Sequence, residues 1–91
     1  MASNFHIISH KNRDRLHLRL SGDFDGGSAY ELIHTLTEHS KGFYEIFIDT
    51  NDLKSIYPYG REVFQKRLGT FKNQFHGITF VGRNGHEFVE D

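Results

Sequence analysis

The 91-residue sequence contains no cysteine, no tryptophan and a single proline. Without cysteine the chain forms no disulfide, which is typical of proteins in the reducing cytoplasm. No apolar run approaches the roughly 20 residues of a membrane-spanning helix, and the first residues lack the charged and apolar regions of a signal peptide. We therefore expect a cytoplasmic protein without a membrane span.

The sequence also lacks an excess of charge of one sign. With 11 basic and 12 acidic residues, its net charge is −1. A general nucleic-acid binder needs a basic face, so this balance argues against a nucleic-acid partner. Partners are expected to be proteins or small molecules.

Signals of catalysis and of metal binding are missing as well. No nucleophile elbow accompanies a Ser–His–Asp set. His6 and His10 are too loosely spaced along one strand for a ligand pair, and His34 and His39 are not four residues apart, so a zinc site is not expected. We therefore predict a protein that is not an enzyme and has no cofactor and no metal.

Phenylalanine is abundant, with nine residues in a chain that is 36% hydrophobic. Large rings let a short chain bury much apolar area per residue. The length suits one domain over residues 1–91 with a phenylalanine-rich core.

The first part of the chain alternates between apolar and polar residues. Residues 5–9 predict a short strand, residues 11–14 a polar turn, and residues 15–21 a second strand with one wet face. The buried face of this second strand is formed by Leu16, Leu18 and Leu20.

A loop and a helix are expected next. Residues 22–27 are rich in Gly and Asp and predict a loop. Ser28 and Glu31 then fit a capping box, and the helix is expected to end near residues 40–42. Its apolar stripe is formed by Ala29, Leu32, Ile33 and Leu36.

The second part repeats this order. Residues 44–49 predict a strand, residues 50–59 an acidic and polar loop, residues 60–73 a helix and residues 77–81 a fourth strand. Gly69 is expected where the helix passes close to the sheet. The apolar stripe of this helix contains Val63, Phe64, Leu68, Phe71 and Phe75.

The resulting β-β-α-β-α-β order predicts an α/β fold with a mixed four-stranded sheet. Strand–helix–strand units imply parallel strands joined by right-handed crossovers. The polar face of residues 15–21 places both helices on one side of the sheet. The loops at 22–27, 50–59 and 82–85 would then share the carboxyl edge, where open α/β sheets usually bind ligands.

Several stretches resemble the STAS domain, the family shared by sulphate transporters and anti-sigma-factor antagonists. Residues 18–25, LRLSGDFD, resemble its second-strand motif, and residues 45–56, EIFIDTNDLKSI, resemble its third strand and following loop. Residues 77–82, GITFVG, resemble the next strand. Residues 57–60, YPYG, occupy the place of the family's Asp-Ser-Ser-Gly signature, and the resemblance spans about residues 5–83.

The resemblance implies a protein-binding module. In bacterial members of the family the domain captures an anti-sigma factor that is also a Ser/Thr kinase, and phosphorylation of the Ser or Thr before the signature glycine releases it. Here Tyr59 precedes Gly60 and Tyr57 replaces the signature Asp, while Ser55 is out of register. A Ser/Thr kinase cannot modify Tyr59, so the usual phospho-switch is expected to be missing.

The leading hypothesis is a non-catalytic regulatory module that docks a protein such as an anti-sigma factor or kinase through residues 50–61. Two tyrosines around Pro58 suit a compact anchor for a partner, although Pro58 could equally begin the helix with the tyrosine rings covering its first turn. The predicted partner-binding residues are Asp23, Asp25, Asp49, Asn51, Asp52, Tyr57, Tyr59, Gly60 and Arg61.

Two alternatives belong to other classes. Asp23, Asp25, Asp49 and Asp52 are expected to lie close together, where they could hold Mg²⁺ for receiver-like phosphoryl signalling, although Asp is also common in turns and caps. The other alternative is an oligomerisation module. Family members usually continue with a further helix, strand and helix, so the short remainder would leave apolar surface uncovered and favour a homodimer.

Overall fold

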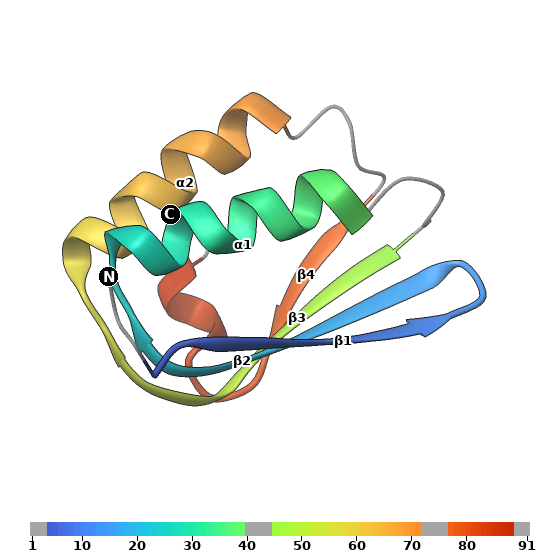
Figure 1. Ribbon diagram of the computed structural model, residues 1–91, viewed down its shortest axis with the longest axis horizontal. Helices are drawn as coiled ribbons and strands as arrows, with labels where there is room; N and C mark the ends of the chain where they lie inside the picture. Colours follow the sequence, from blue (N-terminus) through green and yellow to red (C-terminus); the bar gives the residue numbers. More distant parts are fainter. Residues whose placement is uncertain (1–3, 40–44, 72–76, 89–91) are drawn as a thin grey trace.

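The computed structural model describes residues 4–39, 45–71 and 77–88. Its strands form one sheet in the order β1-β2-β3-β4, in which β1 is antiparallel to β2, and β2, β3 and β4 are parallel. Both long helices lie on the same face of this sheet (Figure 1). The predicted α/β fold, element order and placement of the helices are confirmed. The elements are β1 (His6–Asn12), β2 (Arg15–Phe24), α1 (Gly26–His39), β3 (Glu45–Ile56), α2 (Pro58–Phe71), β4 (Ile78–Val81) and the short 3₁₀ helix η2 (Gly85–Phe88).

The core fills the layer between the sheet and the two helices. The alternating leucines of β2 are fully buried, as their pattern predicts, and so are the rings of Phe24 and Phe64. These two rings meet edge to face, with centroids 6.1 Å apart. The buried hydrophobic side chains are Phe5, Leu16, Leu18, Leu20, Phe24, Ala29, Leu32, Ile33, Leu36, Ile46, Ile48, Leu53, Phe64 and Phe88.

Phe88 of η2 is a core residue that the sequence patterns did not reveal. It is 2% exposed. Its ring stacks on Phe80 with centroids 5.4 Å apart, and it meets Phe24 and Phe64 edge-on at 5.0 and 5.9 Å. The segment after β4 is too short to show a hydrophobic period, which is why no element was predicted there.

Strand β2 continues beyond its predicted end, so the predicted loop at residues 22–27 is wrong. The strand runs to Phe24 and α1 begins at Gly26. Gly22 lies inside the strand with φ +90°, and a Cβ there would collide with the backbone of Asn4. A positive φ and a close backbone neighbour both require glycine, so this residue marks a twisted strand rather than a turn.

Strand β3 is likewise longer, so the predicted loop at residues 50–59 is wrong. The strand continues to Ile56, and α2 begins two residues later. The register with β2 shifts at two points, and at each of them β3 contains one residue more than β2. These bulges change the inward spacing from two residues to three, so that Thr50, Leu53 and the half-buried Ile56 face the core.

The helices differ from their predicted positions in smaller ways. Helix α2 begins at Pro58, and Gly69 has open space around it, since a Cβ there would meet nothing within 4 Å. The prediction of a close approach at Gly69 is therefore wrong. The predicted helix end near residues 40–42 and the stripe residue Phe75 lie outside the described residues. None of the helices in the described ranges is long and apolar enough for a membrane span.

Candidate functional site

The carboxylate of Asp25 caps the start of α1. Its Oδ1 accepts a hydrogen bond from the backbone N–H of Ser28 at 2.9 Å and lies 3.0 Å from the hydroxyl of Ser28. A carboxylate here satisfies a backbone N–H that the helix itself leaves free, and it lies at the positive end of the helix dipole. The predicted capping box of Ser28 and Glu31 is therefore wrong, because the cap lies three residues earlier.

This cap keeps a negative charge at the end of β2. The hydrogen bond from the backbone N–H of Ser28 lowers the pKa of Asp25 below its ordinary value of 3.8. The side chain is thus ionised at neutral pH, at the point where β2 passes into α1.

The first turn of α2 packs directly on this junction. A Cβ on Gly60 would lie 2.6 Å from the carbonyl carbon and oxygen of Asp25, and a Cβ on Gly26 would lie 2.7 Å from Cε2 of Tyr59. Two glycines therefore let the starts of the two helices touch. The ring of Tyr59 lies against the first turn of α1 as a result.

The connection into α2 is equally tight. The backbone N–H of Tyr57 donates to the carbonyl of Phe24 at 2.9 Å, and the N–H of Arg61 donates to the carbonyl of Tyr57 at 3.1 Å. Pro58 takes the first helical position, where its missing N–H leaves no bond unmade. The Tyr57–Pro58 peptide bond is trans.

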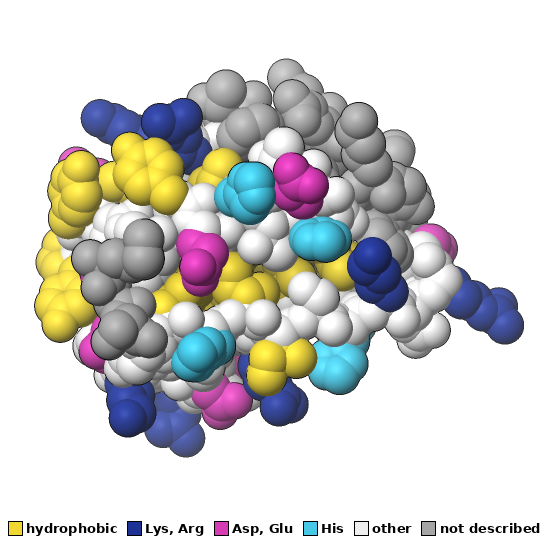
Figure 2. All heavy atoms as spheres, in the orientation of Figure 1, with side chains coloured by type: hydrophobic (Ala, Val, Ile, Leu, Met, Phe, Trp, Pro, Cys, Tyr) yellow, Lys and Arg dark blue, Asp and Glu magenta, His cyan; other side chains and the backbone are white. Residues whose placement is uncertain are grey.

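Exposed aromatic rings gather at this end of the molecule. Tyr57 is 51% exposed and Tyr59 is 66% exposed, while Tyr30 on the second turn of α1 is 49% exposed. The guanidinium of Arg67 lies 5.2 Å from the centre of the Tyr30 ring. Figure 2 shows hydrophobic side chains over the starts of α1 and α2, with Lys and Arg side chains beside them. We name Tyr30, Tyr57 and Tyr59 the aromatic corner.

Asp23 lies beside the same junction, one residue before the end of β2. Its Oδ1 accepts a hydrogen bond from the hydroxyl of Ser55 at 2.7 Å, and its Oδ2 accepts one from the side-chain amide of Asn4 at 3.2 Å. Asp23 and Ser55 also occupy paired positions of β2 and β3. The carboxylate therefore ties the ends of these strands together.

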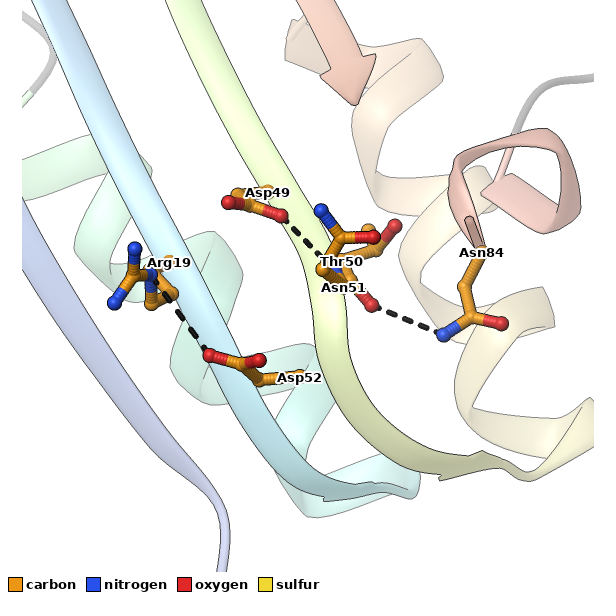
Figure 3. Close-up of polar contacts among 6 residues, drawn as sticks. All are labelled: Arg19, Asp49, Thr50, Asn51, Asp52 and Asn84. Atoms are coloured by element: carbon orange, nitrogen blue, oxygen red, sulfur yellow. Dashed lines mark hydrogen bonds and ion pairs between the residues drawn. The ribbon is translucent and has the colours of Figure 1, made fainter. Parts of the chain in front are cut away.

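The other predicted polar residues form a separate group in the middle of β3, at residues 49–52. Asp49 Oδ1 accepts from the backbone N–H of Asn51 at 2.9 Å, and Asp52 Oδ2 lies 3.8 Å from Nε of Arg19 (Figure 3). Asn51 Oδ1 accepts from the N–H of Arg83 at 2.8 Å. Asp49 is paired with Arg19, four residues before Asp23 on β2, so this group does not join the aromatic corner.

The turn after β4 packs alongside this part of β3. The side-chain amide of Asn84 donates to the carbonyl of Thr50 at 3.0 Å (Figure 3), and the buried hydroxyl of Thr50 donates to the carbonyl of Val81 at 2.8 Å. The predicted shared edge is thus only partly correct. The turn at 82–85 lies beside the middle of β3, whereas the starts of the two helices meet at its end.

The four aspartates do not form the carboxylate cluster that the sequence suggested. Each carboxylate has the separate partner given above, and within residues 4–39, 45–71 and 77–88 no three His, Cys, Asp or Glu side chains are arranged to hold a metal ion. The prediction that these side chains lie close together is wrong, because the bulges and the length of β3 spread them along the strands.

No protein-family model matches the chain, and no curated protein matches it by sequence. Solved structures do match. A Shewanella loihica protein of the DUF3478 family with a SpoIIAA-like fold is 17% identical, with a TM-score of 0.64 over 91% of this chain and 72% of that chain. The anti-sigma factor antagonist SpoIIAA in its unphosphorylated form is 14% identical, with a TM-score of 0.59 over 84% and 70%. This chain has the SpoIIAA-like fold.

Crystal structures of Mglu contain a similar arrangement. The L-glutamate binding form aligns with a TM-score of 0.78 and 10% identity over 92% of this chain, and a further Mglu structure aligns with a TM-score of 0.71 and 18% identity over 80%. This chain spans only 28% of the L-glutamate binding form's chain and 18% of the further Mglu chain. At these identities the likeness concerns the fold alone.

Within the SpoIIAA-like fold, the predicted residues thus divide between two places. Asp23, Asp25, Tyr57, Tyr59 and Gly60 lie around the meeting point of the helix starts, together with the half-buried Arg61. The sequence reasoning missed Tyr30 and Arg67, which join this end through the packing of α1 on α2. Tyr30 lies four residues after Gly26 and so on the same face of α1, the face that Tyr59 of α2 contacts at Gly26. That contact between helices has no signal in the sequence.

Proposed function

We propose that this chain is a non-catalytic regulatory module that docks a protein partner through the aromatic corner. The observation that carries the proposal is the exposure of Tyr57 and Tyr59 beside a backbone that is fixed by the hydrogen bond from Tyr57 to Phe24. Tyrosine supplies a large contact area with a polar tip and few rotatable bonds, and it is enriched among the residues that dominate protein interfaces.

The packing beneath these rings supports the proposal. Gly60 is buried against the backbone of Asp25, and the Tyr59 ring rests on Gly26. A side chain whose place is fixed before binding loses less conformational freedom when a partner arrives. The corner therefore has the properties of an anchor that is ordered in advance.

The resemblance and the fold support one class of partner. SpoIIAA is described as an anti-sigma factor antagonist, and its fold matches this chain over 84% of the length. We propose that the partner is a regulatory protein such as an anti-sigma factor or kinase, in bacterial cytoplasmic signalling. Asp23, Asp25 and Arg61 would supply charged contacts around the rings.

We further propose that no Ser/Thr phospho-switch operates at the start of α2. Tyr59 stands at the second helical position, directly before Gly60. Ser55 lies on β3 and its hydroxyl is bound to Asp23. Mass spectrometry of protein purified from its own cells checks this proposal. We expect no phosphate on Ser55, the Ser or Thr nearest to Tyr59 in the sequence, and phosphorylation of Ser55 would contradict the proposal.

The docking proposal is tested with immobilised protein and variants at the corner. Wild type would capture a partner from a lysate of the source cells, and the affinity of the identified partner would then be measured by calorimetry. We expect Tyr59→Ala and Tyr57→Ala each to weaken binding by about 30-fold, as loss of a dominant interface residue does. Thr79→Ala, at an exposed position on β4, is the matched control and should leave the affinity unchanged.

Thermal melts would establish that each variant is folded. Equal binding by wild type and by the folded double variant Tyr57→Ala/Tyr59→Ala would overturn the surface assignment. Weakening by Thr79→Ala instead would move the interface to the other side of the sheet.

A further inference from the structure

The face of the sheet opposite α1 and α2 carries a histidine pair that the proposed function does not use. His10 on β1 lies directly opposite His17 on β2 in the antiparallel register. Directly opposite residues of an antiparallel pair project from the same face of the sheet, with Cβ atoms about 4.5–5.5 Å apart. Both residues are exposed.

The two imidazoles open into one depression on this face. Its lining residues are His10, His17, Leu18, Arg19 and Asp49. The ring of His17 also stacks on Phe47 of β3, with centroids 4.9 Å apart and an angle of 20° between the rings. The stacking on Phe47 therefore orders one imidazole, and both imidazoles border the same depression.

We propose that His10 and His17 chelate a divalent first-row transition metal, with Cu²⁺ bound most tightly. Metal–nitrogen bonds to histidine are about 2.0–2.1 Å, so one ion reaches two imidazoles whose Cβ atoms start about 5 Å apart. Imidazole suits Cu²⁺, Ni²⁺ and Zn²⁺, and the Irving–Williams order places Cu²⁺ first among them.

The charges around the pair are close to balanced. Arg19 brings a positive charge to the depression, but its Nε lies 3.8 Å from the carboxylate of Asp52, and Asp49 lines the same depression. Among the described residues no third side chain completes a ligand set. The site therefore has two protein ligands, with water in the other positions, and binds an exchangeable metal rather than a structural one.

The topology explains why the spacing along the chain gave no sign of this pair. His6 and His10 lie on one strand, and four residues at about 3.3 Å each separate them by about 13 Å, too far to share an ion. His10 and His17 are seven residues apart in sequence, and only the hairpin at Arg13 and Asp14 brings them together. The chelate thus exists in the folded chain and not in the unfolded one.

Calorimetric titration of the full chain with CuSO₄ at pH 7.5 tests the proposal. We expect one tight site in wild type, and a loss of about tenfold or more in affinity for His10→Gln and for His17→Gln, because each removes the second attachment point of a chelate. His34→Gln is the matched control. It removes an exposed histidine on α1 and should leave the tight site unchanged.

A second measurement uses ZnCl₂ and thermal unfolding. An ion that binds only the folded state raises the melting temperature, so Zn²⁺ should stabilise wild type and the His34→Gln variant but neither variant of the pair. Equal Cu²⁺ affinity in wild type, His10→Gln and His17→Gln would overturn the proposal. A loss in His34→Gln as large as that in the pair variants would overturn it as well.

Discussion

Gly60 lies directly against the backbone of Asp25, so the second helix begins where the cap of the first helix is formed. A Cβ on Gly60 would be 2.6 Å from the Asp25 carbonyl, closer than carbon atoms of folded proteins approach. This contact joins two residues 35 positions apart in the printed sequence. It fixes the position of the aromatic corner relative to the end of β2.

The first prediction concerns this contact. Gly60→Ala should lower the free energy of unfolding by about 1–3 kcal/mol, because the added methyl group forces the helix start away from the Asp25 backbone. Urea unfolding measures the change. Gly69→Ala is the matched control in the same helix, where the methyl group meets open space, and it should raise the free energy of unfolding by about 0.5–1 kcal/mol. Gly60→Ala as stable as Gly69→Ala would contradict the close approach.

The second prediction concerns the cap of α1. Asp25→Ala should lower the free energy of unfolding by about 0.5–2 kcal/mol, since the N–H of Ser28 loses its acceptor. Asp25→Asn keeps an oxygen acceptor without the charge and should lose less. Chemical denaturation at pH 7 measures both. Asp25→Ala with wild-type stability would show that the cap contributes nothing.

The third prediction follows from the lowered pKa of Asp25. A carboxyl group with a depressed pKa in the folded state stabilises the fold fully above its unfolded value, which is 3.8, and that stability is lost as the pH falls through the lower folded value. The difference in unfolding free energy between wild type and Asp25→Asn should therefore shrink below about pH 4. A difference that stays constant from pH 7 to pH 2 would contradict this assignment.

The fourth prediction concerns the hydrogen bond between Thr50 of β3 and Val81, the last residue of β4. The buried hydroxyl of Thr50 donates to the carbonyl of Val81 at 2.8 Å. Thr50→Val keeps the shape and removes the donor, so it should lower the free energy of unfolding by about 1 kcal/mol or more. Thr50→Ser keeps the donor and is the comparison in thermal unfolding. If Thr50→Val is more stable than Thr50→Ser, the hydrogen bond to Val81 does not stabilise the fold.

The fifth prediction concerns the aromatic core. Phe88→Ala should lower the free energy of unfolding by about 3–5 kcal/mol, because it removes a buried ring that contacts three other phenylalanines. Phe47 is half-buried on the face of the sheet opposite the helices, so Phe47→Ala should lower the free energy of unfolding by less. Guanidinium unfolding compares them. Similar losses for both would show that η2 does not close the core.

Regular periodicity predicted the fold. The leucines of β2 alternate strictly, and the stripe of α1 at Ala29, Leu32, Ile33 and Leu36 is buried as its spacing indicates. These patterns are local, and each follows from a single period of the backbone. The polar face of β2 also placed the helices correctly on one side of the sheet.

The site was predicted less well because its geometry is not local. Bulges in β3 gave Thr50, Leu53 and Ile56 a three-residue spacing, which looks like a loop when a strand of period two is expected. Ser28 and Glu31 imitate a capping box, while the actual cap at Asp25 is recognised only once α1 is seen to begin at Gly26. The contact between Gly60 and Asp25 depends on the packing of two helices and has no signal in either segment alone.

Site-specific photo-crosslinking tests the docking surface most directly. A benzoylphenylalanine would replace Tyr59 in one variant and Thr79 in another, and both would be irradiated with the partner captured by the wild-type chain. Our account predicts a covalent adduct from position 59 and none from position 79. An adduct from position 79 alone would contradict docking at the aromatic corner.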